Sequence, residues 1–399
     1  MKKFTIEING ISTSNKGAEL MMAALSEQLN LMYSNIRLTV GQSFGDYTSR
    51  AKYGLYTTGV PGRPGRIAGF LTRTGLMNGT DSLKEYVGFT LPDEIDAVID
   101  ASGFAYSDKW PLRSDNYGLF KKMEKKELKY KPLIMMPQAL GPFEKEETAD
   151  AARRLFERAE LVCARDRQSF DAVKGLGGNI NVKQYPDMTV LVSPMEPPRK
   201  FTEKPFCAIV PNYRMLDKTG KGDEYKKFLH HAIQRLLEKE MNPVFLLHEY
   251  HQNDRNLMNE INADYSLPVF EHEDPRVLKG ILGMATFVIG SRFHSLVSTF
   301  SQGVPAIGTS WSHKYEELFN EFDAMDLLAT ELDNLEKLDQ LIDDLSNPEK
   351  REKWMKRISN AGDKVKDEAS NMWDEIEGII NKKKSVQSGQ IQNDFKIIE

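Results

Sequence analysis

The feature that most constrains the fold is a repeated alternation of short apolar runs with segments of helical spacing. In the first half, the apolar runs cover residues 4–8, 36–40, 97–99, 133–136 and 161–164. Helical spacing follows over residues 16–31 and recurs over 147–158. Because strands that alternate with helices in this way form parallel pairs, the pattern predicts an α/β fold with helices on both faces of parallel sheets.

A stretch dense in proline and charge, SPMEPPRKFTEKP, interrupts this series at residues 193–205. Few of its residues could continue a helix or pack in a core, so it is the best candidate for a domain boundary. A second series follows, with apolar runs at 206–210, 244–247, 287–289 and 306–307 and helical spacing over 225–239. We therefore predict two domains and two further segments: 1–195, 205–346, a charged helical segment 347–382 that closes the second domain or crosses back to the first, and a polar, frayed tail 383–399.

Composition and charge narrow the class of protein. The chain has 399 residues, too many for one ordinary core, and its 40% hydrophobic and 28% charged residues are typical of a globular protein. Its 53 basic and 58 acidic residues give a net charge of −5, which argues against a nucleic-acid-binding protein. An anionic small molecule held by a few local arginines remains compatible with this charge.

Cysteine usage and hydropathy indicate a cytoplasmic location. Cys163 and Cys207 lack CxxC spacing, so they predict neither a disulfide framework nor a zinc site. The first ten residues are typical of a strand and not of a signal peptide. No run approaches the roughly 20 apolar residues that span a bilayer. We expect the protein to meet any membrane-bound partner from the aqueous side, as a peripheral contact.

The loops that follow the apolar runs are the candidate sites, because ligands of such sheets bind beyond the carboxyl ends of the strands. The first loop, NGISTSNKGAE at residues 9–19, combines small residues with a helix N-terminus that suits an anion. A plain turn capped by Ser14 or Asn15 is an equal alternative. The loops at residues 100–108 and 137–143 are weaker candidates, although Gln138 could hydrogen-bond a hydroxyl group.

Two arginines lie just beyond apolar runs. Arg165 directly follows LVCA, and a guanidinium there suits bidentate binding of a carboxylate or phosphate, unless it caps the next helix together with Asp166. We favour a structural role for Arg167. Arg214 follows the run at residues 206–210. The HEYH sequence at residues 248–251 lacks the HExxH spacing, and we predict no metal site there.

The strongest candidate is the segment FVIGSRFHSLVSTFSQGVPAIG at residues 287–308. It is typical of a strand, a tight polar turn, a helix, a glycine stop and a further strand. Arg292 and His294 fall in the first helical turn, where their charges meet the positive end of the helix dipole unless an anion intervenes. Such a local conflict often marks a functional site. A surface arginine and a histidine satisfied within the fold are the alternative.

At these residues the chain resembles the polysaccharide pyruvyl transferase family, whose hallmark is a Gly-x-Arg-x-His turn, a helix, a Gly-x-Pro turn and a small strand. Further matches are SNKGAEL, PQALGPF, ARDRQSF, Pro186-Asp187 and SHKYE at residues 312–316. There is one departure. The family carries a run of glycines after the strand at 97–99, whereas this chain has Ala101-Ser102-Gly103-Phe104, whose side chains narrow the loop.

The resemblance implies two Rossmann-like domains of the GT-B type that face each other across a cleft. It implies transfer of a pyruvyl group from phosphoenolpyruvate to a sugar of a cell-surface glycan or its lipid-linked precursor, as a ketal, with no cofactor and no metal. We expect Arg165 and Arg292 to clamp the donor with help from Arg214, and His294 to act as the general acid. The remaining expected residues are Ser291 and His313 for the donor, and Asn15, Gly17, Glu19, Ser102, Gly103 and Gln138 for the acceptor or the cleft loops.

Two other functions are compatible with the same architecture. Retaining nucleotide-sugar glycosyltransferases commonly hold the donor ribose with a glutamate about five residues before the glycine of the Gly-x-Pro turn. That position is Ser298 here, which disfavours this function. A non-catalytic sugar-binding relative is the second alternative; the altered loop at residues 101–104 supports it, whereas the presence of Arg292 and His294 opposes it.

Overall fold

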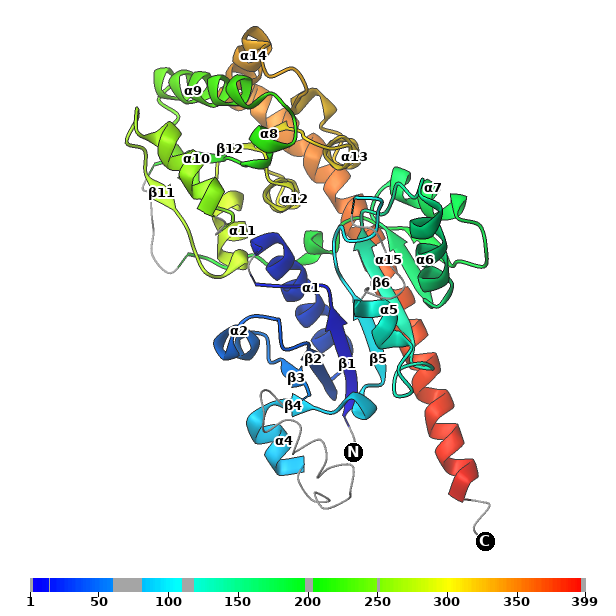
Figure 1. Cartoon of the computed structure of the whole chain (residues 1–399). Coiled ribbons are helices and arrows are strands. Elements are labelled where there is room, and N and C mark those ends of the chain that lie inside the picture. The colour runs from blue at the N-terminus through cyan, green and yellow to red at the C-terminus, as the bar shows by residue number, and fades with distance from the viewer. Residues whose placement is uncertain are drawn as a thin grey trace. The chain divides into compact units, whose positions relative to one another are not determined.

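The computed structural model describes residues 3–13, 15–59, 81–109, 118–197, 204–249 and 252–395 (Figure 1). The chain forms two compact units. The first comprises Met1–Thr13, Leu25–Pro186 and Ser370–Glu399, and the second comprises Ser14–Ala24 and Asp187–Ala369. The second of these units resumes at Asp187. Residues 198–203 of the stretch predicted as a domain boundary, 193–205, lie outside the described part. Two helices are divided between the units. The start of the first helix belongs to the second unit, and the last helix changes unit at Ser370.

The first unit contains an eight-stranded sheet with the order β4-β3-β2-β1-β5-β6-β7-β8, in which every neighbouring pair is parallel. Its strands are β1 (Phe4–Asn9), β2 (Ile36–Val40), β3 (Tyr56–Thr58), β4 (Phe89–Thr90), β5 (Ala97–Asp100), β6 (Leu133–Gln138), β7 (Leu161–Ala164) and β8 (Val182–Gln184). All five predicted apolar runs are confirmed as strands. The additional strands, β3, β4 and β8, are only two or three residues long.

The helices of the first series are α1 (Lys16–Met32), α2 (Tyr47–Lys52), α4 (Asp81–Val87), α5 (Gly118–Met123), α6 (Glu146–Glu157) and α7 (Arg167–Gly175), with a short 3₁₀ turn at Pro92–Glu94. The helical spacing predicted over 16–31 and 147–158 corresponds to α1 and α6. The amphipathic helix α6 buries Leu155 and Phe156 against the sheet, and the Phe156 ring meets Tyr106 edge-on at 5.9 Å. This burial anchors the helix.

The second unit contains a six-stranded parallel sheet with the order β11-β10-β9-β12-β13-β14. Its strands are β9 (Cys207–Val210), β10 (Pro243–Leu246), β11 (Val269–Phe270), β12 (Phe287–Gly290), β13 (Ala306–Thr309) and β14 (Leu328–Ala329). The strand order reverses between β9 and β12. In open α/β sheets, ligands bind beyond the carboxyl ends of the strands at this switch point.

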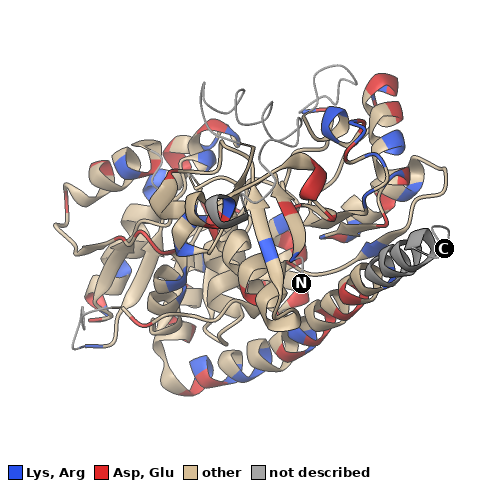
Figure 2. Cartoon of the chain, turned by 90° about the horizontal axis from the view of Figure 1, so that it is seen from below, with Lys and Arg blue, Asp and Glu red and all other residues tan. Residues whose placement is uncertain are grey.

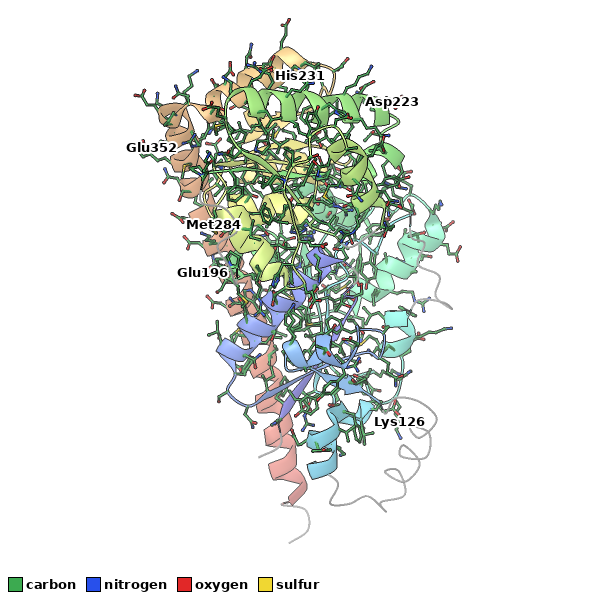
Figure 3. The ribbon with its side chains drawn as sticks, turned by 90° about the vertical axis from the view of Figure 1, so that its left-hand side faces the viewer. Lys126, Glu196, Asp223, His231, Met284 and Glu352 are labelled. Atoms are coloured by element: carbon green, nitrogen blue, oxygen red, sulfur yellow. The ribbon has the colours of Figure 1, made fainter. Side chains whose placement is uncertain are left out.

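The helices of the second unit are α8 (Arg214–Asp217), α9 (Gly222–Glu238), α10 (Gln252–Asn262), α11 (Pro275–Gly283), α12 (Phe293–Phe300), α13 (Lys314–Glu321) and α14 (Leu335–Ser346), with 3₁₀ turns at Met188–Leu191 and Met325–Leu327. Helices α9 and α14 are joined by polar contacts. His231 on α9, labelled in Figure 3, lies 2.9 Å from Asp339, and Arg235 contacts the same carboxylate at 2.8 Å.

The final helix, α15, runs from Pro348 to Phe395 and passes from the second unit into the first at Ser370. In the first unit its Glu375 accepts hydrogen bonds from Lys183 at 2.8 Å and from Tyr185 at 2.5 Å. Acidic and basic residues lie along the part of this helix that is coloured in Figure 2. The helix extends through most of the segment for which a frayed polar tail is predicted, because no proline interrupts it. No helix in the described part of the chain is long and apolar enough to cross a membrane.

Candidate functional site

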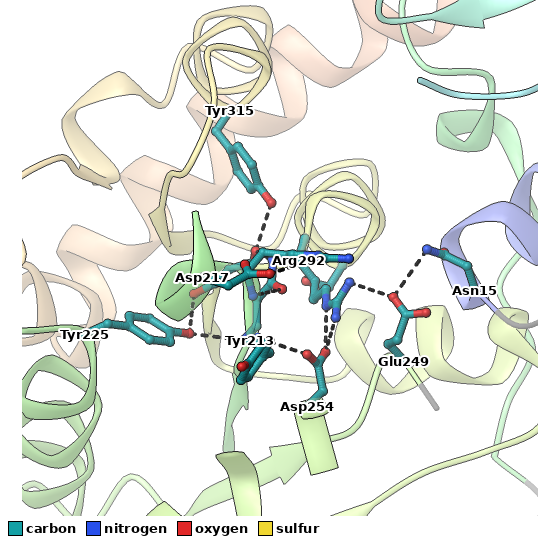
Figure 4. Close-up of polar contacts among 12 residues, drawn as sticks. Asn15, Tyr213, Asp217, Tyr225, Glu249, Asp254, Arg292 and Tyr315 are labelled. Atoms are coloured by element: carbon teal, nitrogen blue, oxygen red, sulfur yellow. Dashed lines mark hydrogen bonds and ion pairs between the residues drawn. The ribbon is translucent and has the colours of Figure 1, made fainter. Parts of the chain in front are cut away.

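The turn between β12 and α12 is held by its own backbone and by buried hydroxyl groups. Ser291 is 2% exposed; its amide donates to the carbonyl of Val210 at 3.0 Å, and its carbonyl accepts from Asn212 at 2.6 Å and Tyr315 at 2.9 Å. Its hydroxyl lies 2.7 Å from the hydroxyls of Tyr225 and Thr309 (Figure 4 shows Tyr225 and Tyr315). These contacts give Ser291 a role in shaping the turn, and its contact with the donor stays a prediction.

Arg292 is the residue that precedes α12, and two protein carboxylates hold its guanidinium (Figure 4). Its Nε donates to Asp254 Oδ2 at 2.7 Å and its Nη1 donates to Glu249 Oε2 at 2.6 Å, while Nη2 also contacts Asp254. The side chains of Asp254 and Glu249 are only 2% and 8% exposed. The anion expected beside Arg292 is therefore already supplied by the protein, which corrects the argument that the charge conflict by itself requires a ligand.

Both carboxylates are fixed by further contacts in the second unit. Asp254 accepts from the amide of Tyr213 at 2.9 Å, and Glu249 accepts from Asn15 Nδ2 at 3.3 Å (Figure 4). The sequence reasoning did not assign either residue to the site. For Glu249, the available signal is its place directly after the apolar run at 244–247; Asp254 lies on α10, and nothing local marks it.

His294 lies in the first turn of α12, and its ring packs on the start of α1. A Cβ added to Gly17 would lie 2.1 Å from His294 Nδ1, so this contact requires glycine. On the other side of the ring, Nε2 lies 3.5 Å from Oδ2 of Asp187 and, buried, forms no hydrogen bond with the described residues. Asp187 is fixed because its other oxygen accepts from the amide and hydroxyl of Thr189 at 2.9 and 2.6 Å. Asp187 thus joins the site, although only a motif match pointed to it.

The sequence left two roles open for the start of α1, a plain helix cap and a part of the binding site, and the contacts of Asn15 fit both. Asn15 Oδ1 accepts from the amide of Ala18 at 3.1 Å, as a helix cap does, while its Nδ2 reaches Glu249. Lys16 is 5% exposed and donates to Glu19 at 2.6 Å and to the carbonyl of Glu273 at 2.5 Å. Glu19 is consequently a buried partner of Lys16.

His248 adds a second imidazole near this cluster. It follows β10, is 4% exposed, and its Nε2 makes no hydrogen bond in the described part of the chain. Burial, and after it the charges of His294, Arg292 and Lys16, lower the pKa of His248 to about 3. His248 is therefore neutral at physiological pH. The described residues contain no group of three or more His, Cys, Asp or Glu placed to hold a metal, and His251 lies outside them.

Arg214 and His313, both expected at the donor, have different surroundings. Arg214 begins α8, its side chain is 47% exposed, and its guanidinium donates to Asp217 at 2.5 Å. His313 precedes α13 and is partly buried. Next to it, Lys314 lies 5.0 Å from the ring centre of Phe293 and 4.8 Å from that of Trp311. Phe293 therefore contacts both the Lys314 ammonium group and the His294 ring, and the centres of the Phe293 and His294 rings lie 5.4 Å apart in an edge-on arrangement.

The predicted loop residues of the first unit gather around Asp100, at the end of β5. Its carboxylate accepts from Ser102 and Tyr106 at 2.9 Å and from Gln138 Nε2 at 3.3 Å. Burial raises the pKa of Asp100 against the opposing effect of these donors. A Cβ at Gly10 would lie 2.0 Å from Ser102 Oγ, so the altered loop packs closely on the end of β1.

Gly103 and Arg165 are also placed in the first unit. Gly103 has a φ of +72°, which favours glycine. Arg165 follows β7 directly, is 5% exposed, and its amide donates to the carbonyl of Gln138 at 3.1 Å. Asp166 caps α7 through the amide of Ser169 at 2.7 Å. The capping role considered for this pair thus belongs to Asp166, and Arg165 remains a buried cation at a strand end.

The position that holds a glutamate in retaining nucleotide-sugar glycosyltransferases is enclosed here. Ser298 lies within α12 and is 0% exposed, and its hydroxyl is buried without a hydrogen bond to the described residues. A short, enclosed side chain of this kind cannot hold a ribose in the way a glutamate does.

Solved structures share the fold over nearly the whole chain. A glycosyltransferase from Rickettsia africae has a TM-score of 0.58 at 12% identity, with 96% of this chain and 99% of that one covered. HepE of Anabaena, in complex with UDP and glucose, has a TM-score of 0.55 at 12% identity, with 95% and 100% covered. The UDP-GlcNAc 2-epimerase from Neisseria meningitidis bound to UDP-GlcNAc has a TM-score of 0.51 at 12% identity, with 93% and 100% covered.

These likenesses define a two-domain α/β fold of the GT-B type. At 12% identity, these similarities support the fold and no more specific property of this chain. The family comparison is more specific, since the model of the polysaccharide pyruvyl transferase family matches residues 15–313. That range includes Gly17, Asp187, Arg292 and His294, which the second unit brings together. The chain therefore belongs to the polysaccharide pyruvyl transferase family.

Proposed function

We propose that this protein transfers the pyruvyl group of phosphoenolpyruvate to a sugar of a cell-surface glycan or of its lipid-linked precursor, forming a ketal. The observation that carries the proposal is the enclosure of His294 between Gly17 and Asp187, next to a turn fixed on every side. A proton donor in such a site is held in one orientation, as general acid catalysis requires.

The proposed reaction begins with protonation of the methylene carbon of phosphoenolpyruvate by His294. This step creates an oxocarbenium-like carbon that one sugar hydroxyl attacks, and the proton of that hydroxyl returns to the neutral imidazole of His294. The C–O bond to phosphate then breaks, and a second hydroxyl of the same sugar attacks the same carbon. The proton of the second hydroxyl leaves with the phosphate. One phosphoenolpyruvate and one diol thus give one ketal and one hydrogen phosphate, and the scheme needs no redox partner.

The cations have distinct parts in this scheme. A guanidinium has five N–H groups, and three groups of Arg292 contact Asp254 and Glu249. We assign the remaining two N–H groups to phosphoenolpyruvate. Arg292 then acts through positioned hydrogen bonds, because two carboxylates already offset its charge. Arg214 and His313 of the second unit are proposed to contact the donor carboxylate or phosphate, and the donor contact of Arg165 stays a prediction. Asp187 holds the His294 ring and does not itself react.

The experiment that tests this function measures thermal unfolding with phosphoenolpyruvate, with UDP-sugars and with GDP-sugars. A ligand that binds the native state raises the unfolding temperature by mass action. We expect stabilisation by phosphoenolpyruvate. Stabilisation by nucleotide sugars alone would show that the donor is a nucleotide sugar and not phosphoenolpyruvate, although the enclosed Ser298 disfavours such a donor. No stabilisation by any of these compounds would favour a non-catalytic sugar-binding protein.

A further inference from the structure

One face of the central strand β1 is polar, although the strand is buried. Strands in a covered parallel sheet are normally apolar on both faces. In β1, Thr5, Glu7 and Asn9 alternate with Ile6 and Ile8, and Thr5 and Glu7 are 1% and 0% exposed. Because β1 lies between β2 and β5, its polar face is inside the first unit and not at an edge. A purely structural strand would place apolar side chains there.

The neighbouring strands continue this face toward their carboxyl ends. Thr39 of β2 is in register with Glu7, and Thr90 of β4 is in register with Thr58 of β3. The hydroxyls of Thr39 and Thr58 lie 3.1 Å apart, and Thr58 donates to Glu7 Oε1 at 2.7 Å. Hydrogen bonds thus link the polar side chains of β1, β2 and β3, and Thr90 of β4 lies in register with the last of them.

Lys122 of α5 completes the row. Its Nζ lies 2.6 Å from Glu7 Oε1 and donates to Asn9 Oδ1 at 2.8 Å. The Lys122 side chain is 20% exposed, whereas that of Glu7 is fully buried. The lysine therefore balances the carboxylate and fixes the orientation of both Glu7 and Asn9.

Several atoms of this row have no partner among the described residues. Glu7 Oε2, Asn9 Nδ2 and Thr90 Oγ1 are buried and form no hydrogen bond there. Buried polar groups in native proteins are nearly always satisfied, and leaving one unpaired costs folding free energy. Three such atoms in one row, at the end of the sheet where α/β proteins bind ligands, indicate a ligand that supplies the missing partners.

We propose that this polar face, defined as Glu7, Asn9, Thr39, Thr58, Thr90 and Lys122, binds the hydroxyl groups of a sugar. The open atoms are one carboxylate acceptor, one amide donor and one hydroxyl that does both. A sugar hydroxyl both donates and accepts, so adjacent hydroxyls match such a set. A phosphate offers mainly acceptors at neutral pH, and its negative charge is unfavourable beside the Glu7 carboxylate. Identification of this sugar with the acceptor rests on the proposed function; the binding itself does not.

The test is saturation-transfer NMR with the methyl glycosides of mannose, galactose and N-acetylglucosamine at millimolar concentration. We expect at least one of them to bind the wild-type chain and the affinity to fall about tenfold or more in Glu7→Gln, because a hydrogen bond to a charged group is lost. The matched control is Glu94→Gln, which alters another Lys–Glu pair of the first unit, 2.7 Å from Lys84. Binding should persist in that variant.

A second variant separates binding from folding. Asn9→Ala removes the open amide donor at a partly exposed position and should also weaken glycoside binding, with unfolding monitored by circular dichroism. The proposal is overturned if no glycoside binds the wild-type chain, if Glu7→Gln and Asn9→Ala both fold and bind normally, or if inorganic phosphate displaces the sugar. Because no phosphoenolpyruvate is present, failure of the proposed transfer reaction and failure of this site give different results.

Discussion

The carboxyl ends of the two sheets carry polar clusters that differ in how completely the protein satisfies them. In the second unit, Asp254 and Glu249 both pair with Arg292, and each accepts a further hydrogen bond from the protein. In the first unit, one oxygen of Glu7 is engaged by Lys122 and Thr58, while the other has no hydrogen bond with a described residue. The charge of Arg292 is thus neutralised by protein carboxylates, whereas the polar face keeps buried atoms without a hydrogen bond to the described residues.

This difference changes how the sequence should be interpreted. Two cations at a helix start suggest a bound anion, yet residues 38 and 43 positions away along the chain supply the anions for Arg292. An unpaired buried atom in the folded chain is a stronger sign of a ligand than a local charge conflict. Within the second unit, His294 Nε2 forms no hydrogen bond with a described residue, although Asp187 Oδ2 lies 3.5 Å away.

The largest expected effect is that of His294→Ala. Loss of a positioned general acid should lower the release of phosphate from phosphoenolpyruvate, in the presence of acceptor, by about 10²–10⁴-fold. Binding of phosphoenolpyruvate, measured by calorimetry, should remain largely intact. His231→Ala on α9 is the control and should retain turnover. Near-normal turnover in His294→Ala would remove this residue from the acid role.

Arg292→Ala tests whether the second-unit cluster is closed by charge pairing. The change leaves Asp254 and Glu249 buried without their cation, so we expect the free energy of unfolding in urea to fall by about 3–5 kcal/mol. Glu7→Gln in the open polar face should cost only about 1 kcal/mol. Equal losses in the two variants would contradict the contrast between a closed and an open cluster.

Gly17→Ala tests the contact that fixes His294. The added methyl group would lie 2.1 Å from Nδ1, so the imidazole must move, and a displacement of about 1 Å can lower turnover by about 10²-fold. Gly378→Ala in α15 is the matched control, because nothing lies within 4 Å of the added atom there. Steady-state phosphate release should distinguish the two. Unchanged turnover in Gly17→Ala would show that the ring position does not limit the reaction.

The lowered pKa of His248 should make the stability of the second unit depend on pH. Its pKa is about 3 in the folded protein and about 6.5 when unfolded, so the unfolded state binds the proton first as the pH falls. The stability associated with its neutral form is full above pH 6.5 and is lost progressively toward pH 3. Between pH 7 and pH 5 this loss is about 2 kcal/mol. Urea unfolding of His248→Gln should lack it, and an identical pH profile in the variant would contradict the assignment.

Asp100→Asn in the first unit has the smallest expected effect, and unlike the other variants it should stabilise the protein. Burial raises the pKa of Asp100, so its contribution to stability is present at acid pH and is lost as the pH rises through the folded pKa. Replacing the carboxylate by a neutral amide should therefore stabilise the protein by about 1 kcal/mol at pH 7. The gain should shrink at acid pH. Destabilisation at pH 7 would mean that its hydrogen bonds outweigh the cost of burial.

The strands show how far local sequence patterns predict the fold. Runs of four or more apolar residues, such as 133–136 in β6, correspond to strands with buried faces. The strands missed by the sequence are β3, β4, β8, β11 and β14, none longer than three residues. Such short segments carry too little periodicity to be recognised. They become strands because the neighbouring strand offers hydrogen-bonding groups, and four of the five lie at sheet edges.

By itself, the sequence determined the α/β class, the buried strands and the place of the Gly-Ser-Arg-Phe-His turn, because these depend on periodicity and turn chemistry within a few residues. Only the tertiary structure decided which charges meet. Strand order brings Asp254 and Glu249 to Arg292. The chain enters the second unit again at Asp187, and this places the Asp187 carboxylate beside His294. It also turned one face of β1 into a row of buried, partly unpaired polar atoms. Such pairings depend on distances in space between residues far apart in the chain, and no local pattern encodes them.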